Sequence, residues 1–283
     1  DIVNEIRLAG AHFIYSLDDN FFDIPASLSD SPTQEQLAAV EYFLRTAEMV
    51  WVTTPYLQKC FEKFNPNIKV LPNCLDERLL VRRGSTVEGS LYEPYKKVIG
   101  YMGTLTHDND LLMILPALKK ICARHPEVEI QIIGVAGSSD THAKIQGLPI
   151  RFIQPTRGEE TYPNFMLWYT NWVSWDIAIA PLIDTDFNIA KSDIKFLDYA
   201  VIGSAGIYSD VTAYRDSVIH QKNGWLVSDT PGDWEDALES LLEDYEQRTN
   251  LAIEAQDLVF SSRILKQCGL TWLEALRELD TSG

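Results

Sequence analysis

Short apolar runs alternate with helical patterns through the second two-thirds of the chain, and this alternation limits the fold more than any other feature. Six β-rich runs occur, at 96–104, 128–135, 149–155, 176–182, 205–209 and 224–228. Apolar residues at helical spacing predict helices over 110–125, 162–172 and 231–247, and residues from 188 onward supply another after the fourth run. Apolar strands that are each followed by a helix form a parallel sheet covered on both faces. The sequence therefore predicts an α/β domain with a doubly wound parallel, Rossmann-like sheet.

The first ninety or so residues show the same alternation on a smaller scale. Strands are expected within 11–19, 49–55 and 68–73, and helices within 32–47 and 56–64. Three strands are too few for a second complete Rossmann-like sheet, which indicates a small or truncated N-terminal α/β domain at 1–90. The polar, glycine-containing stretch 82–94 is typical of a linker. Residues 95–283 then form the C-terminal domain, which ends in helices.

The amino-acid composition indicates which classes of binding partner and which cellular compartment to expect. The 283 residues carry 41 acidic against 24 basic side chains, a net charge of −17 that disfavours nucleic acid and anionic lipid as partners. No apolar run is long enough for a transmembrane segment. The four cysteines are scattered without metal-ligand spacing, which favours a reducing, cytoplasmic location. In so acidic a chain, any bound phosphate needs a few locally placed cations.

The strand ends are where ligands bind in doubly wound sheets. The first strand of the C-terminal domain ends at Gly103, followed by Thr104. A glycine allows close backbone approach and the threonine adds a hydroxyl, although a plain tight turn has the same residues. The chain has neither the G-x-G-x-x-G fingerprint nor a Walker A sequence at these ends, which disfavours a nicotinamide cofactor.

The stretch NIAKSDIKFLDY, which follows the fourth apolar run, combines cations, caps and an acid at a helix start. Ser192 and Asp193 are candidate caps, and a helix N-terminus attracts phosphate. Lys191 and Lys195 supply positive charge. Asp198 lies three residues past Lys195 on the same face, where a carboxylate can accept hydrogen bonds from a vicinal diol such as a ribose. Phosphates together with a diol indicate a nucleotide; the simpler alternative is a solvated, charged helix face.

Several segments resemble a known family in their order and spacing. They are GYMGTLTHDNDL, IIG, IAPL, KSDIKFLDYAVIGSAGIYSD and NGWLV, preceded by FIYSLDDNFFDIP, VWVTTPYL and VLPNCLD. Together they resemble the GT-B glycosyltransferases, most closely the large retaining group, glycosyl transferases group 1, that uses nucleotide-sugar donors and builds bacterial polysaccharides. The resemblance covers most of residues 12–230.

The resemblance assigns expected roles to matching positions. It implies donor binding by Gly103 and Asp198, with Lys191 and Lys195 as catalytic cations that stabilise the leaving nucleoside diphosphate. Thr104 and Ser192, identified above from the strand end and the helix start, complete the expected donor-binding residues. Asp198 stands where the family usually has Glu and would hold the donor ribose. Where the family often has a second Glu that contacts the transferred sugar, this chain has Ala190, so that contact is missing or moves to Asn188 or Asp186.

The implied chemistry is retaining, hexosyltransferase-like transfer that needs no metal and no cofactor. The donor is a nucleoside-diphosphate sugar, and the acceptor is a saccharide or a lipid-linked saccharide. A face-to-face mechanism, in which the departing phosphate acts as base, fits the lack of an obvious enzymic nucleophile. A longer protein with additional domains is compatible with the resemblance.

Two other function classes remain open. A nucleotide-sugar epimerase of GT-B-like fold requires a pair of acid/base carboxylates and a histidine. A non-catalytic nucleotide-sugar-binding module of a larger protein fits the short first domain. Binding and transfer assays with nucleotide sugars separate these possibilities.

Two residue groups carry alternative interpretations. Asp18 and Asp19 end a strand and are acceptor-side candidates, or simply loop acids. Trp168, Trp172 and Trp175 repeat at helical spacing; tryptophans bind sugars, but this period is more typical of a core, and we expect all three there.

Overall fold

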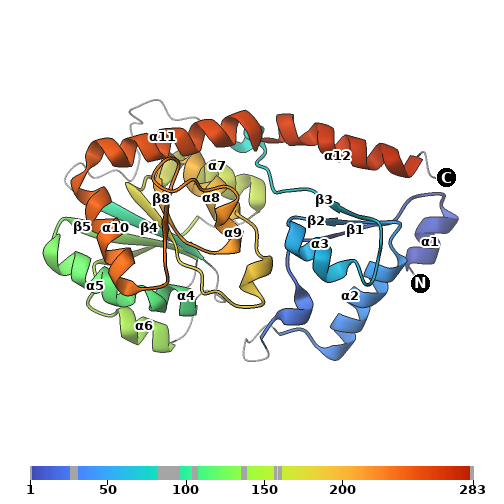
Figure 1. Ribbon diagram of the computed structural model, residues 1–283, viewed down its shortest axis with the longest axis horizontal. Helices are drawn as coiled ribbons and strands as arrows, with labels where there is room; N and C mark the ends of the chain where they lie inside the picture. Colours follow the sequence, from blue (N-terminus) through green and yellow to red (C-terminus); the bar gives the residue numbers. More distant parts are fainter. Residues whose placement is uncertain are drawn as a thin grey trace. The chain divides into compact units, whose positions relative to one another are not determined.

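The chain divides into two compact units, each described here by itself. The computed structural model describes residues 2–25, 31–81, 96–103, 108–134, 139–155, 158 and 161–280. The first unit comprises Asp1–Cys74, Asp184–Ser192 and Leu265–Gly283, and the second comprises Leu75–Ile183 and Asp193–Ile264. The sequence colours in Figure 1 show that the red C-terminal helix α12 and the blue N-terminal elements belong to one unit.

The second unit contains a six-stranded parallel sheet in the order β6-β5-β4-β7-β8-β9. Its strands are β4 (Lys97–Gly103), β5 (Val128–Gly134), β6 (Ile150–Ile153), β7 (Ile177–Ala180), β8 (Ala205–Ser209) and β9 (Trp225–Val227). The order steps outward from β4 in one direction and from β7 in the other, which defines a doubly wound sheet. All six predicted strands are confirmed.

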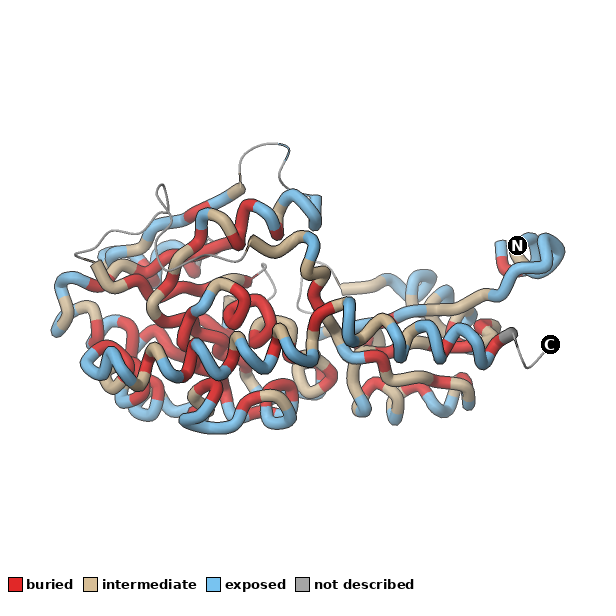
Figure 2. The backbone as a smooth tube through the Cα atoms, turned by 90° about the horizontal axis from the view of Figure 1, so that it is seen from above, coloured by how far each residue is buried: buried red, intermediate tan, exposed pale blue. Residues whose placement is uncertain are grey.

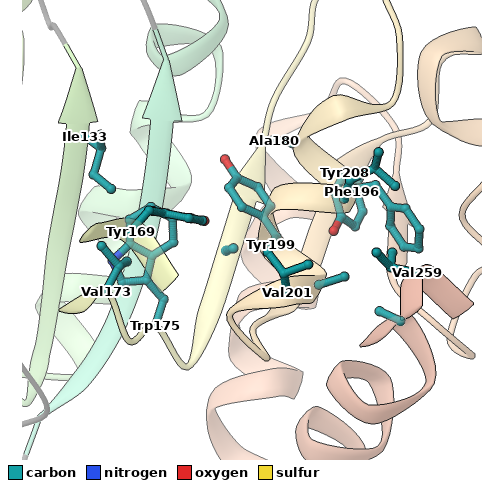
Figure 3. Packing of buried hydrophobic residues seen from close by; sticks show 14 of the residues in the cluster. Ile133, Tyr169, Val173, Trp175, Ala180, Phe196, Tyr199, Val201, Tyr208 and Val259 are labelled. Carbon is teal, nitrogen blue, oxygen red and sulfur yellow. The ribbon is translucent and has the colours of Figure 1, made fainter. Parts of the chain in front are cut away.

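Helices cover both faces of this sheet. They are α4 (Asp108–Met113), α5 (Leu115–Arg124), α6 (Ser139–Ile145), α7 (Tyr162–Trp172), α8 (Ile194–Val201), α9 (Thr212–Arg215), α10 (Pro231–Glu243) and α11 (Tyr245–Ser262), with a 3-10 turn, η2 (Glu77–Leu79). Successive β4 residues face opposite layers: Val98 packs with α7, α8 and α11, whereas Ile99 packs with α5 and α10. Figure 2 shows the buried residues of this unit in red, and Figure 3 shows part of one buried layer, with Tyr169 of α7, Tyr199 of α8 and Tyr208 of β8.

Two predicted helices are each interrupted. The helix expected over 110–125 is two helices, since α4 ends at Met113 and α5 begins at Leu115. Pro116, in the first turn of α5, has no N–H to donate and its ring excludes the carbonyl four residues earlier. The helix expected over 231–247 ends at Glu243, because Asp244 adopts an extended conformation and caps α11 by accepting from the Gln247 N–H at 2.8 Å.

The tryptophan prediction is correct for two residues and wrong for the third. Trp175 is buried against Gly100, where a Cβ would lie 1.7 Å from the indole ring, and its N–H donates to Gln131. Trp168 is buried as well. Trp172, the last residue of α7, is 46% exposed. The core does reach this end of the helix, since Thr170 and Val173 are buried, but Trp172 lies on the outer face of α7.

The first unit contains a three-stranded parallel sheet in the order β1-β2-β3. Its elements are β1 (Ile14–Leu17), β2 (Met49–Val52), β3 (Ile68–Val70), α1 (Ile2–Leu8), α2 (Gln34–Thr46), α3 (Pro55–Phe61) and α12 (Leu265–Asp280), with 3-10 turns η1 (Phe21–Asp23) and η4 (Asn188–Ala190). Leu44, Val50 and Phe61 centre its core. The three strands expected in this part of the sequence are present.

Two later segments of the chain belong to the first unit by packing, although the sequence placed both in the C-terminal domain. Ala190 is fully buried in the first unit's core. In α12, Ala275 and Leu279 pack against Met49, and the Trp272 ring lies 6.0 Å from that of Trp51. The predicted linker 82–94 lies outside the described residues. In the part of the chain that is described, no helix has the length and apolar character needed to cross a membrane.

Candidate functional site

The carboxyl edge of the second unit's sheet presents two glycines side by side. Gly103 ends β4 and lies opposite Gly134, which ends β5. Gly134 has a φ of +89°, and a Cβ there would lie 1.9 Å from the Gly103 carbonyl oxygen. Only glycine fits this position, and a Cβ at Gly103 would lie 2.7 Å from the Tyr101 hydroxyl oxygen, so close packing within the sheet requires both glycines. Thr104, the next residue of the predicted site, lies outside the described residues.

Helix α8 is fixed to this edge through a buried tyrosine. The Tyr199 hydroxyl donates to the Ile179 carbonyl of β7 at 3.0 Å and accepts from the Met102 N–H of β4 at 3.3 Å. Burial raises the pKa of Tyr199 well above its usual range, so the hydroxyl stays protonated and can make both bonds. The Tyr169 hydroxyl also donates to the Asp198 carbonyl at 3.3 Å. These bonds hold α8 against the ends of the two central strands.

Asp198 is a buried carboxylate on this fixed helix. Only 8% of the residue is exposed. The described residues give its carboxylate no hydrogen bond. Burial raises the pKa of the carboxyl to about 7, and the positive charge of Lys195 opposes that shift. Neither oxygen is among the described atoms that are fully buried without a hydrogen-bond partner, so both can be reached by a ligand that brings hydroxyl donors.

Asp193 stands at the N-cap position of α8, but its side chain makes no capping bond, which corrects the predicted cap. Its carboxylate instead accepts two hydrogen bonds from the Arg263 guanidinium, at 2.7 and 2.9 Å, and one from the Ser217 hydroxyl. A bidentate arginine is a stronger, more directional partner than a backbone N–H. The start of α8 is thereby tied to the end of α11.

Lys191 belongs to the first unit, where it is already paired. Its Nζ lies 3.3 Å from Asp19 Oδ1 and 4.3 Å from the centre of the Phe187 ring. Its side chain is 18% exposed. The ion pair and the cation–π contact hold the ammonium in one place and offset part of its charge. The predicted cation and a predicted acceptor-side acid are thus neighbours.

The residues flanking Lys191 are also positioned by the first unit. The Asn73 amide donates to the Ser192 hydroxyl at 2.8 Å. The Thr54 hydroxyl donates to the Ala190 carbonyl at 3.2 Å, and Ala190 is fully buried. Asp18 is exposed. A glutamate would not fit at Ala190 without disrupting this core.

The predicted residues therefore fall into two groups. Lys195 and Asp198 lie together on α8, in the same unit as Gly103, whereas Lys191 lies with Asp19 in the first unit, together with Ser192 and Asp18. The roles assigned to them stay predictions.

Two positions in the second unit were missed by the sequence argument. Gly134 is a glycine at the end of a predicted strand, as Gly103 is, so the criterion that selected Gly103 would have found it too. Arg263 lies 70 residues from Asp193, and no local pattern connects the two. Across the described ranges, no three His, Cys, Asp or Glu side chains are grouped as metal ligands.

Comparisons with known proteins agree with this architecture. Residues 96–244, more than half of the chain, match the family model described as Glycosyl transferases group 1. No curated protein matches the chain.

Three solved structures illustrate the likeness in fold. HepE of Anabaena, solved with UDP and glucose, is 14% identical with a TM-score of 0.71, over 98% of this chain and 74% of HepE. Sucrose-phosphate synthase of Thermosynechococcus elongatus is 13% identical with a TM-score of 0.69, over 99% and 71% of the two chains. A glycosyltransferase of Rickettsia africae is 10% identical with a TM-score of 0.71, over 100% and 80%. The GT-B fold predicted from the sequence is confirmed.

Proposed function

The chain belongs to the group 1 glycosyltransferases, and we propose that it moves a hexosyl group, with retention, from a nucleoside-diphosphate sugar to a saccharide or lipid-linked acceptor. The proposed setting is polysaccharide synthesis in the cytoplasm. HepE was solved with UDP-glucose as well as with UDP and glucose, which favours a uridine nucleotide as the first donor to test.

Asp198 is the observation that carries this proposal. Its buried carboxylate has acceptor capacity that the described residues leave unused. A ribose diol supplies two hydroxyl donors to one carboxylate, and burial strengthens such bonds. We propose that Asp198 binds the donor ribose in its ionised form.

The diphosphate is proposed to lie at the glycine edge of the same unit. Gly103 ends β4 at the carboxyl edge of the sheet, where ligands bind in such folds, and Lys195 stands on the first turn of α8, whose N-terminus favours anions. Lys191, from the first unit, is proposed as a second cation. Positive charge placed on the leaving diphosphate lowers the barrier to breaking the glycosidic bond. We therefore propose that this chemistry needs neither metal nor cofactor.

The sugar and acceptor contacts differ from the family pattern in this proposal. The buried Ala190 offers no carboxylate, so we propose that Asn188 or Asp186, the latter exposed, contacts the transferred sugar. The departing phosphate takes the proton of the acceptor hydroxyl as the new bond forms. Asp18 and Asp19 are the acceptor-side candidates.

Calorimetric titration of the full chain with UDP-glucose tests the donor site. The wild type should bind, and Asp198→Ala should weaken binding about tenfold or more, because a buried hydrogen-bonded pair of groups is lost. Asp236→Asn, an exposed position on α10, is the matched control and should bind like the wild type. Equal affinity in Asp198→Ala and wild type would remove the basis of the proposal. Release of UDP that depends on an added saccharide acceptor, with the product anomer read by NMR, then distinguishes transferase from binding module.

A further inference from the structure

A hollow on the outer face of α7 lies apart from the candidate donor site. It has a volume of about 330 Å³ and is lined by Asn164, Leu167, Trp168, Asn171 and Trp172. The donor-site residues follow the carboxyl ends of strands, whereas Trp172 ends α7 and is followed by the start of β7 at Ile177. Because helices run antiparallel to the strands they connect in such sheets, the Trp172 end of the hollow lies toward the opposite edge.

The lining side chains share one helix face and have a rigid base. Asn164, Trp168 and Asn171 are spaced by four and three residues, which places them in a row along α7. Trp168 is buried and packs against the Phe165 ring at 5.7 Å. On the other side of the helix, Tyr169 is buried in the core shown in Figure 3. The Trp168 ring is therefore held in place before any ligand arrives.

The amides that border the tryptophans have unused hydrogen-bonding capacity. The Asn164 amide nitrogen donates to the Gly158 carbonyl at 3.0 Å, which fixes the side chain, while its oxygen has no donor among the described residues. The Asn171 amide has no hydrogen bond to them at all. Each amide presents both a donor and an acceptor, the combination that recognises a hydroxyl group.

The described residues that line the hollow are all uncharged, in a chain whose net charge is −17. None of these described residues is acidic, basic or a histidine. A nucleic acid or another polyanion needs cations here, and a basic peptide needs acids. A neutral sugar needs neither: its apolar C–H face packs on an indole ring while its hydroxyls pair with the amides.

We propose that this face of α7 is a second saccharide-binding site, which takes a neutral oligosaccharide. Trp172, 46% exposed, supplies the open stacking surface, Trp168 the base, and Asn164 and Asn171 the polar contacts. Binding here requires no nucleotide. A role in holding a growing glycan near the enzyme rests on the proposed transferase function, but the binding itself does not.

The test is calorimetric titration of the full chain with three neutral hexasaccharides, maltohexaose, cellohexaose and laminarihexaose. At least one should bind the wild type, and Trp172→Ala should weaken that binding about tenfold by removing the stacking surface. Trp172→Phe keeps an aromatic face and should recover most of the affinity. Tyr245→Ala removes a 70% exposed aromatic ring from α11 and is the matched control.

Two further measurements separate this site from the donor site and from protein contacts. UDP-glucose affinity should be unchanged in Trp172→Ala, so failure of the donor proposal leaves this one intact. No binding of any hexasaccharide up to about 10 mM would overturn the proposal, since that limit corresponds to less than about 3 kcal/mol of affinity. Hexasaccharide binding that is equal in Trp172→Ala and wild type would also overturn it. A change in sedimentation of Trp172→Ala without saccharide binding would identify the face as a contact between chains instead.

Discussion

Replacing Asp198 with asparagine should change how the stability of the chain depends on pH. Burial raises the pKa of the Asp198 carboxyl from its usual 3.8 to about 7. Below about pH 4 both folded and unfolded chains hold the proton, and the carboxyl has no effect on stability. As the pH rises toward 7, only the folded chain keeps it, so stability falls by about 1.4 kcal/mol per pH unit. Over these roughly three units the loss amounts to about 4 kcal/mol, and it is complete above pH 7.

The amide in Asp198→Asn does not ionise, so the variant lacks this loss. Its stability relative to the wild type should therefore improve by up to about 4 kcal/mol between about pH 4 and pH 8. Burial of the amide adds an offset, but the offset is the same at every pH and cancels from the trend. Of the neighbouring groups, Lys195 lowers the pKa of Asp198, and that effect is contained in the value of about 7. Burial raises the pKa of Tyr199, which stays neutral throughout.

Urea denaturation of the full chain at each pH measures this difference directly. Wild type, Asp198→Asn and the exposed control Asp236→Asn are compared, and the control removes any pH effect that does not come from burial. If the advantage of Asp198→Asn over wild type is the same at about pH 4 and pH 8, the carboxylate is not buried as described and the reasoning fails.

Three further predictions concern the same unit. UDP-glucose affinity should fall by up to about tenfold per pH unit below 7, because the ribose binds the ionised Asp198; calorimetry at several pH values should show this fall in the wild type and not in Asp198→Asn. Gly134→Ala should destabilise the chain by about 2 kcal/mol or more, because the added Cβ clashes with the Gly103 carbonyl oxygen. Gly147 has a similar φ of +88° but nothing within 4 Å of the added Cβ, so Gly147→Ala should destabilise the chain by only about 1 kcal/mol. Similar losses for both variants in urea denaturation would contradict the clash. Arg263→Met should lower the free energy of unfolding by about 3 kcal/mol, because it leaves the Asp193 carboxylate buried without its partner. In a double-mutant cycle, adding Asp193→Asn to Arg263→Met should recover part of that loss, and strictly additive losses would count against the pairing.

The strands were predictable because their sequences are nearly continuous in apolar residues. The inner strands β4, β5, β7 and β8 are largely buried on both faces of the sheet, and residues buried in this way are mostly apolar in sequence. The interruptions of the helices were also present in the sequence. Pro116 is a typical helix-breaking residue, and Asp244 is a typical N-cap residue. Because the apolar residues keep their helical spacing across both positions, the periodicity alone does not show where one helix ends and the next begins.

The division into units was not predictable, because it depends on packing between distant segments. Residues 184–192 and α12 carry no local pattern that assigns them to the first unit; Ala190 and Leu279 show their membership only through the cores they join. The exposure of Trp172 has a similar cause. Helical spacing shows which side chains share a face but not which face the core covers: at the end of α7, Tyr169 and Thr170 are buried whereas Trp172 is exposed.

Only the part of the candidate site that is local in sequence was predictable. Lys195 and Asp198 are three residues apart on one helix, so sequence spacing was enough to bring them together. Lys191 was expected beside them, but α8 begins only at Ile194, and Lys191 pairs with Asp19, 172 residues away in sequence. Long-range ion pairs of this kind leave no periodic signal.

A crystal structure of the chain with UDP bound tests the central claim most directly. The account predicts that the ribose hydroxyls donate to the Asp198 carboxylate and that the diphosphate lies against the backbone at Gly103. A uridine nucleotide bound elsewhere, with the Asp198 carboxylate still without a hydrogen-bond donor, would contradict it.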